Sequence, residues 1–154
     1  MTQIPDSAII RYADELVRDC APASLYNHCV RTYLFGSLLC EQAGATPDAE
    51  VAYLGSVLHD LALVPPYDGP GSFEQEGATK ARELLTSQGY PEDRSALVHD
   101  SVAHHLNVGA EKMGAEIALV HLGAGADVIG LRMERLERPA VDAIIAGYPR
   151  LDFK

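Results

Sequence analysis

Cysteine is scarce in this chain of 154 residues, with Cys20, Cys29 and Cys40 spaced 9 and 11 positions apart. An odd number without a Cys-x-x-Cys pair argues against a disulfide framework and against a thiolate zinc site. Free thiols of this kind fit a reducing compartment, so we expect a cytoplasmic protein.

Basic residues are also few. The chain has 12 Lys and Arg against 22 Asp and Glu, which gives a formal net charge of −10 at pH 7. This surplus of negative charge argues against non-specific electrostatic binding to a phosphate backbone, so we expect no nucleic-acid partner. It also disfavours anionic substrates at long range.

No uninterrupted apolar run approaches the roughly 20 residues that cross a bilayer. The N-terminal stretch lacks a basic start and carries Asp6, Asp14 and Glu15 among its apolar positions, unlike a signal peptide. We therefore expect no membrane partner. The hydrophobic fraction of 47% is typical of a globular protein, and the length suits a single domain over residues 1–154.

Helical periodicity of apolar residues runs through nearly the whole chain, whereas the strict alternation typical of strands is missing. The pattern predicts an all-α bundle of about six to seven helices. Dense Pro and Gly at 65–71 predict a loop. The expected helices span residues 6–20, 24–44 with Ser24 as N-cap, 46–63, 72–89, 91–106, 111–131 and 139–146.

Polar residues at core-facing positions of these helices are the most informative. His28 falls on an apolar face and so points inward. Asp127 lies in the middle of an apolar stripe, where an unpaired carboxylate would cost several kcal/mol. It therefore needs a metal, a cation or another strong donor. His59 and Asp60 end an almost entirely apolar run just before the predicted loop.

Each of these residues also has a structural explanation. His28 could be a satisfied core histidine, and Asp127 could form an ion pair with Arg31 or Arg132. Taken together, two imidazoles and two carboxylates suit one divalent transition metal (Zn, Fe, Mn, Ni or Co) with open positions for water and substrate.

The order of these residues resembles the signature of the HD-domain superfamily, all-α metal-dependent hydrolases with a His, then a His-Asp pair, then a distant Asp. The resemblance covers residues 24–131 and implies four metal ligands, His28, His59, Asp60 and Asp127. The segments SLYNHCVRTYLFG, VLHDLAL, SFEQEGA and VAHHLNVG are most similar to the cyanamide-hydratase-like branch.

A metal in this site would lower the pKa of a bound water towards neutrality. We expect two catalytic residues, Asp60, which would orient or deprotonate that water, and His105, which would transfer a proton. His105 falls where the hydratase-like branch has a histidine, which implies a role in the site.

Four further residues are expected to contact substrate. Arg31 could hold an anionic group, although a salt bridge to Asp127 is the alternative. Phe73 and Glu74 match the Ser-Phe-Glu segment of the branch, but could equally be a core residue and a helix N-terminal carboxylate. His104 could bind substrate or lie exposed at its helix C-terminus.

A second His-Asp pair, His99-Asp100, competes for the metal. It lies in mid-helix among polar neighbours with no loop after it, so we favour the earlier pair. No histidine lies between Asp60 and His99, where binuclear members carry one. A second metal, which would depend on His104 and His105, is therefore not favoured.

The expected function is hydrolysis of a small organic substrate, or hydration of a nitrile-like or cyanamide-like group. Phosphohydrolases of the superfamily commonly carry Lys or Glu just after the His-Asp pair, where this chain has Leu61, Ala62 and Leu63. A nucleotide or phosphomonoester phosphohydrolase is therefore the alternative, and a metal-binding regulatory domain without turnover is the alternative from another class. The chain is shorter than many members of the branch, so a homodimer that completes the pocket is a candidate assembly.

Overall fold

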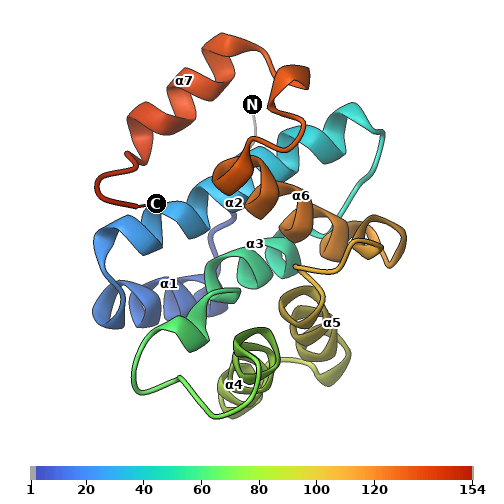
Figure 1. Cartoon of the computed structure of the whole chain (residues 1–154). Helices are drawn as coiled ribbons and strands as arrows, with labels where there is room; N and C mark the ends of the chain where they lie inside the picture. The colour runs from blue at the N-terminus through green and yellow to red at the C-terminus, as the bar shows by residue number, and fades with distance from the viewer. Residues whose placement is uncertain (1–2, 154) are drawn as a thin grey trace.

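Seven α-helices and three short 3₁₀ turns make up the regular structure of residues 3–153, the part of the chain that the computed structural model describes (Figure 1). No strand occurs in this range, so the all-α prediction is confirmed. None of its helices is long and apolar enough to cross a membrane. The elements are α1 (Ala8–Cys20), α2 (Ala23–Gln42), α3 (Ala49–Leu58), η1 (Leu61–Leu63), α4 (Phe73–Ser87), α5 (Glu92–Ala103), η2 (Ala110–Lys112), α6 (Ala115–Ile129), η3 (Met133–Arg135) and α7 (Arg138–Gly147).

The helix boundaries differ from the predicted ones where local chemistry intervenes. Pro22 is the N-cap of α2, so Ser24 lies inside the helix. Proline suits a helix start because its missing N–H would have no intrahelical partner there. Asp48 caps α3, since its Oδ1 accepts a hydrogen bond from the backbone N of Val51 at 3.1 Å. The expected helix at 111–131 begins later, because Gly114 adopts a φ of 143°.

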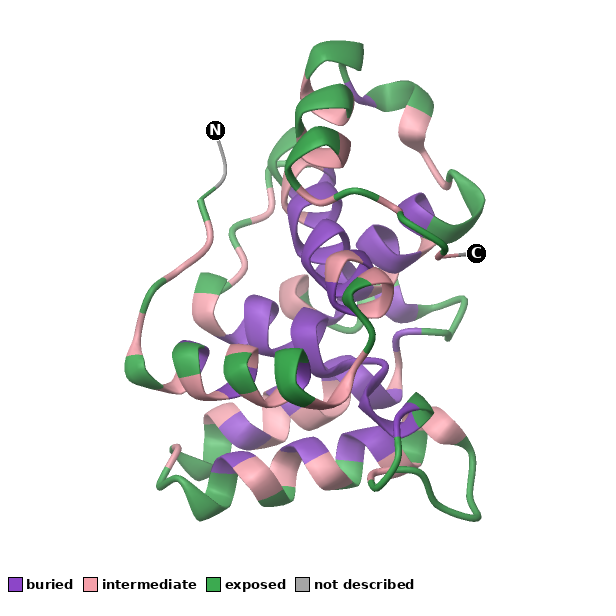
Figure 2. Ribbon diagram, turned by 90° about the vertical axis from the view of Figure 1, so that its left-hand side faces the viewer, coloured by how far each residue is buried: buried purple, intermediate pink, exposed green. Residues whose placement is uncertain are grey.

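Helix α2 lies at the centre of the fold and is buried around most of its circumference (Figure 2). It contacts α1, α3, α6 and α7. Periodicity predicted that α2 buries one face only, whereas the structure buries residues on most of its sides. A helix surrounded by others places polar side chains in the interior, and these must find partners there.

Two glycines allow α2 and α6 to pack with their backbones in contact. A Cβ atom at Gly123 would lie 1.8 Å from the carbonyl O of Thr32, and one at Gly36 would lie 2.3 Å from that of Leu119. No side chain fits at either position. The two helices run antiparallel through this contact, which brings the start of α2 beside the end of α6.

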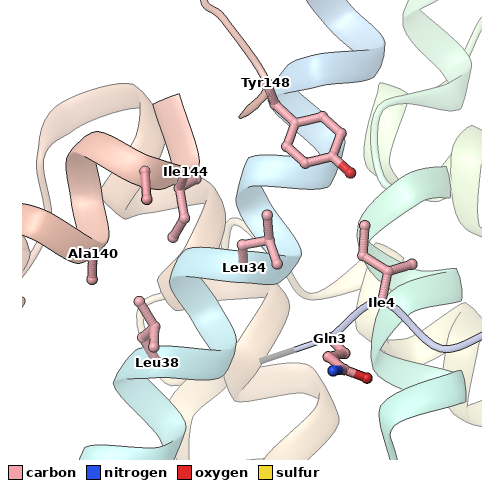
Figure 3. Close-up of a pocket in the computed structure, with 8 residues that line it drawn as sticks. Gln3, Ile4, Leu34, Leu38, Ala140, Ile144 and Tyr148 are labelled. Atoms are coloured by element: carbon pink, nitrogen blue, oxygen red, sulfur yellow. The ribbon is translucent and has the colours of Figure 1, made fainter. Parts of the chain in front are cut away.

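An apolar cavity of about 520 Å³ lies between α2, α7 and the N-terminal segment (Figure 3). It offers neither an imidazole nor a carboxylate, so it does not contain the predicted chemistry. Its lining consists of Gln3, Ile4, Leu34, Leu38, Ala140, Ala143, Ile144 and Tyr148.

Candidate metal centre

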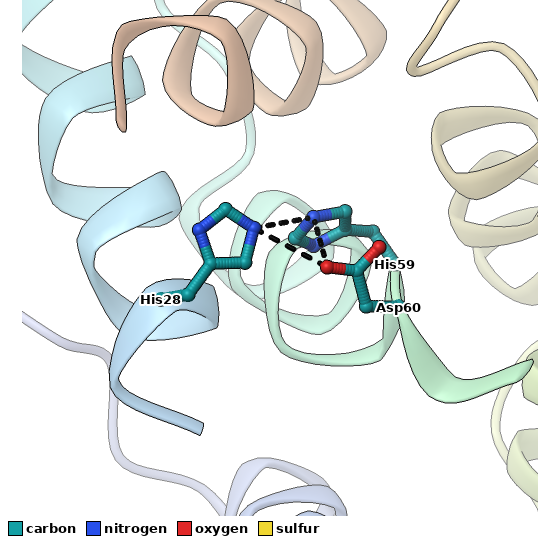
Figure 4. Close-up of side chains that lie close together, drawn as sticks. All are labelled: His28, His59 and Asp60. Atoms are coloured by element: carbon teal, nitrogen blue, oxygen red, sulfur yellow. Dashed lines mark hydrogen bonds and ion pairs between the residues drawn. The ribbon is translucent and has the colours of Figure 1, made fainter. Parts of the chain in front are cut away.

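Three buried side chains bring one potential ligand atom each to a common point (Figure 4). His28 comes from α2, His59 is the C-cap of α3, and Asp60 follows directly. Nε2 of His28 lies 3.2 Å from Nε2 of His59 and 3.3 Å from Oδ2 of Asp60. Nε2 of His59 is also 3.3 Å from this oxygen. We call these three residues the ligand cluster.

Hydrogen bonds on the outer side of both imidazoles fix their tautomers. Nδ1 of His28 lies 2.7 Å from Oδ2 of Asp127, and Nδ1 of His59 lies 2.6 Å from the carbonyl O of Ser56. A carboxylate and a carbonyl accept hydrogen bonds, so each Nδ1 carries the proton. When neutral, each ring therefore directs the lone pair of Nε2 into the cluster, as metal-binding histidines do.

The spacing of the cluster fits a divalent metal. Two imidazole lone pairs and a carboxylate oxygen repel one another unless a cation or a proton lies between them. A tetrahedral metal with bonds of about 2.0–2.1 Å has ligand atoms roughly 3.3 Å apart. The three observed separations are 3.2, 3.3 and 3.3 Å. His28, His59 and Asp60 therefore form one face of a suitable coordination shell.

The pKa shifts of the cluster leave an ionised carboxylate at its centre, and this negative charge favours a bound cation. Burial lowers the pKa of His59 to about 4. Burial also acts to lower the pKa of His28, but the hydrogen bonds to Asp127 and Asp60 outweigh it and raise that pKa. Burial acts to raise the pKa of Asp60, yet the adjacent His59 and His28 hold it below its usual range. Asp60 is therefore ionised, and its charge attracts a cation.

Asp127 lies behind His28 instead of joining the cluster. Its Oδ1 accepts from Nε of Arg31 at 2.7 Å and from Nη1 of Arg150 at 3.0 Å, while Oδ2 accepts from Nη2 of Arg31 at 2.9 Å. Burial acts to raise the pKa of Asp127, but the hydrogen bonds with His28 and Arg31 outweigh it and lower that pKa. In this arrangement α6 presents the carboxylate to the outer nitrogen of the His28 ring and not to the ligand cluster, so Asp127 as a fourth metal ligand stays a prediction.

Arg31 is fully buried, and its guanidinium is hydrogen-bonded on several sides. Besides its two bonds to Asp127, its Nη1 donates to the carbonyl O of Tyr148 at 2.8 Å and of Pro149 at 3.1 Å. The structure thus shows the salt bridge to Asp127 that was the alternative, and contact of Arg31 with an anionic substrate stays a prediction.

His105 lies beside the ligand cluster. Its ring centroid is 4.9 Å from that of His59 and 5.7 Å from that of Phe73, edge to face in both cases. Nδ1 of His105 donates to the carbonyl O of Val102 at 2.7 Å, which leaves Nε2 able to accept a proton. Burial lowers the pKa of His105, and the negative charge of Glu74 is close enough to act in the opposite sense. Three predicted site residues therefore lie on this side of the cluster. His105 packs against His59, Phe73 packs against His105, and Glu74 is near enough to affect the pKa of His105.

Two of the other predicted groups lie apart from the cluster. Nδ1 of His104 accepts a hydrogen bond from Nδ2 of Asn107 at 2.7 Å, on the exposed side of the chain. His99 and Asp100 pair with each other at 3.0 Å, with 26% and 50% of their side chains exposed. The structure therefore brings the earlier pair, His59 and Asp60, together with His28, and leaves the later pair apart from it.

Sequence reasoning missed the segment at residues 148–153, which reaches the same site. Phe153 stacks on His28 with ring centroids 4.3 Å apart and planes inclined by 12°. Arg150 bonds to Asp127, and two carbonyls of the segment bind Arg31. Periodicity gives no signal here, because the segment follows the last helix and is irregular.

Comparison with known proteins agrees with this geometry. No curated protein sequence matches the chain. Among protein-family models, that of the HD domain matches residues 25–146, well over half of the chain, and the matched range contains the whole ligand cluster. The chain therefore belongs to the HD domain family, whose members are generally metal-dependent hydrolases.

Proposed function

We propose that this protein uses a divalent transition metal, held by His28, His59 and Asp60, to add water to a small uncharged organic substrate. The observation that carries the proposal is the ligand cluster itself, in which outer hydrogen bonds turn two imidazole lone pairs towards a buried carboxylate. When bound, such a metal supplies Lewis-acid activation of water near neutral pH.

His105 is the proposed proton-transfer residue. With Nδ1 committed to the carbonyl of Val102, Nε2 accepts a proton from the attacking water and then delivers it to the substrate. For a nitrile-like group, an O–C bond forms, one C–N π bond breaks, and the nitrogen receives that proton. Because burial lowers its pKa, protonated His105 is a ready proton donor. Ionised Asp60 would orient the water.

The charges around the cluster favour an uncharged substrate. The guanidinium of Arg31 already donates hydrogen bonds to Asp127 and to two backbone carbonyls. The residues just after the His-Asp pair, Leu61–Leu63, are apolar. The net charge of −10 repels anions as they approach. Nitriles, cyanamides and amides are therefore the substrate class that we propose.

A phosphomonoester or nucleotide is the second candidate, and one observation favours it. Arg150 pairs with Asp127 at the site and leaves 37% of its side chain exposed, so this cation could reach an anionic substrate. A non-catalytic metal-binding domain is the outcome if neither class of substrate reacts.

The test begins with the metal content of protein purified without chelator or metal-affinity resin. We expect about one equivalent per chain, and turnover of nitriles or amides in preference to phosphate esters. His105→Gln is expected to keep the metal but lose about 10²–10⁴-fold in rate. His104→Gln is the matched control, because that imidazole lies outside the cluster. Wild-type protein that neither contains nor takes up metal would overturn the proposal.

A further inference from the structure

The chain turns back after α7 and ends beside α2 (Figure 1). Residues 148–153 contact His28, Arg31 and Asp127 there. The segment is attached to α2, which carries His28, and to α6, which carries Asp127. On α2, the carbonyl O of Pro149 accepts from Nδ2 of Asn27 at 3.0 Å and from Nη1 of Arg31 at 3.1 Å. On α6, Nη1 of Arg150 donates to the backbone O and to Oδ1 of Asp127, at 3.1 and 3.0 Å.

Phe153 covers one face of His28 at the end of this segment. The stacked rings are 4.3 Å apart, and Cζ of Arg31 lies 5.7 Å from the centroid of the Phe153 ring. His28 is thus fixed at its outer nitrogen by Asp127 and on one face by Phe153, while Nε2 faces the ligand cluster.

The backbone of the segment is held in an unfavourable conformation. Leu151 has a φ of 54°, in the left-handed region that costs a branched side chain energy. Its side chain is 62% exposed and gains little in return. The turn is closed by a bond from the backbone N of Phe153 to the O of Arg150 at 2.9 Å. The contacts on either side of Leu151 therefore impose this turn.

We propose that residues 148–153 are a positioning element of the metal centre, in which Phe153 holds the ring of His28 and slows the loss of the metal. The inference rests on the proposed metal site. It concerns residues beyond the HD-domain match, which ends at residue 146. Phe153 is a positioning residue, since it acts on the metal through His28 and is not itself a ligand.

The experiment measures how fast Co²⁺-loaded protein passes its metal to an excess of chelator. For Phe153→Ala we expect a loss at least about tenfold faster than in the wild type, as when groups that orient a ligand are removed. The visible spectrum of bound Co²⁺ should change with the freed ring of His28. Phe153→Tyr keeps the stacked ring and is expected to restore the wild-type rate. Val108→Ala, at an exposed position outside the segment, is expected to leave the rate unchanged.

The outcomes separate this inference from the proposed function. A wild-type chain that takes up no Co²⁺ overturns both. One equivalent of Co²⁺ that leaves Phe153→Ala and the wild type at the same rate overturns the positioning role alone. If Phe153→Ala does not fold, Phe153→Leu, which keeps apolar cover but removes the aromatic ring, gives the same comparison.

Discussion

Oδ2 of Asp127 lies 2.7 Å from Nδ1 of His28, and this hydrogen bond sets the tautomer and the orientation of the imidazole. The carboxylate keeps the proton on the outer nitrogen and leaves Nε2 as a lone pair for the ligand cluster. Asp127 is in turn fixed by Arg31 through two hydrogen bonds. The orientation of one imidazole thus depends on a buried ion pair that reaches from α2 to α6.

Asp127→Asn tests this arrangement directly. We expect the variant to bind one equivalent of metal with about 10–100-fold lower affinity, since groups that orient ligands have effects of this size. His28→Ala, in contrast, removes a ligand and should abolish tight binding. Competition with a chelator of known affinity measures both. If Asp127→Asn lost the metal as completely as His28→Ala, Asp127 would be a direct ligand instead.

The same substitution should also reduce stability. Arg31 is fully buried, and Asp127→Asn removes its carboxylate partner. A buried charge without its partner costs about 3–5 kcal/mol, so a fall of this order in the free energy of unfolding is expected. Urea unfolding of the metal-free proteins measures it. A loss below about 1 kcal/mol would mean that Arg31 and Asp127 do not depend on each other.

Added metal should stabilise the wild-type protein and leave His59→Ala unaffected. A metal that binds only the native state adds about 2.7 kcal/mol at a concentration of 100 times Kd. Removal of His59 takes one atom from the ligand cluster. Thermal unfolding with and without metal gives the comparison. His99→Ala, in the surface His-Asp pair, should keep the full increase in Tm. An equal increase in His59→Ala would place the metal elsewhere.

Gly123→Ala should weaken the packing of α2 on α6. The new Cβ would lie 1.8 Å from the carbonyl O of Thr32, so one helix must shift. We expect a loss of at least about 1–3 kcal/mol in the free energy of unfolding, measured in denaturant. Gly147→Ala is the control, because nothing lies within 4 Å of a Cβ at that position. Equal stability of the two variants would contradict the close approach.

Asp48→Asn should show a pH-dependent loss of stability. Hydrogen bonds from Arg94 lower the pKa of Asp48. A lowered pKa in the folded state means that this carboxylate stabilises the fold above its ordinary pKa, and that the effect fades as the pH falls through the lowered value. Asparagine is an equally good N-cap for α3, so the substitution removes only the charge. The pair is partly exposed, and we expect at most about 1 kcal/mol at pH 7.

Urea titrations of both proteins at pH 7 and below pH 3 measure this difference. The wild type and Asp48→Asn should converge in stability at the acidic end. A constant difference at all pH values would show that the hydrogen-bond geometry, and not the charge, matters.

The helical class and the ligand cluster were predictable because both follow from local patterns. Buried His28 and the His59-Asp60 pair occur at core-facing positions of apolar helices, where a polar side chain has few explanations. The distinction between His59-Asp60 and His99-Asp100 was also accessible, since only the first pair follows an almost entirely apolar helix.

Other features depend on tertiary structure and could not be predicted. Whether Asp127 meets a metal or the outer nitrogen of His28 depends on the distance between α2 and α6, which Gly36 and Gly123 set. The contact of Phe153 with His28 joins residues far apart in the sequence through an irregular segment. Sequence periodicity carries no information on either distance.

The separation in sequence of the contacts at the site has a consequence for folding kinetics. His28 lies 31 positions from His59 and 99 from Asp127, and Arg31 bonds to a carbonyl 117 positions away. Closing such loops is entropically costly, so these contacts should form late, after α2 and α6 have docked. A metal that recognises only the assembled site would then slow unfolding, while the rate of folding stays nearly unchanged.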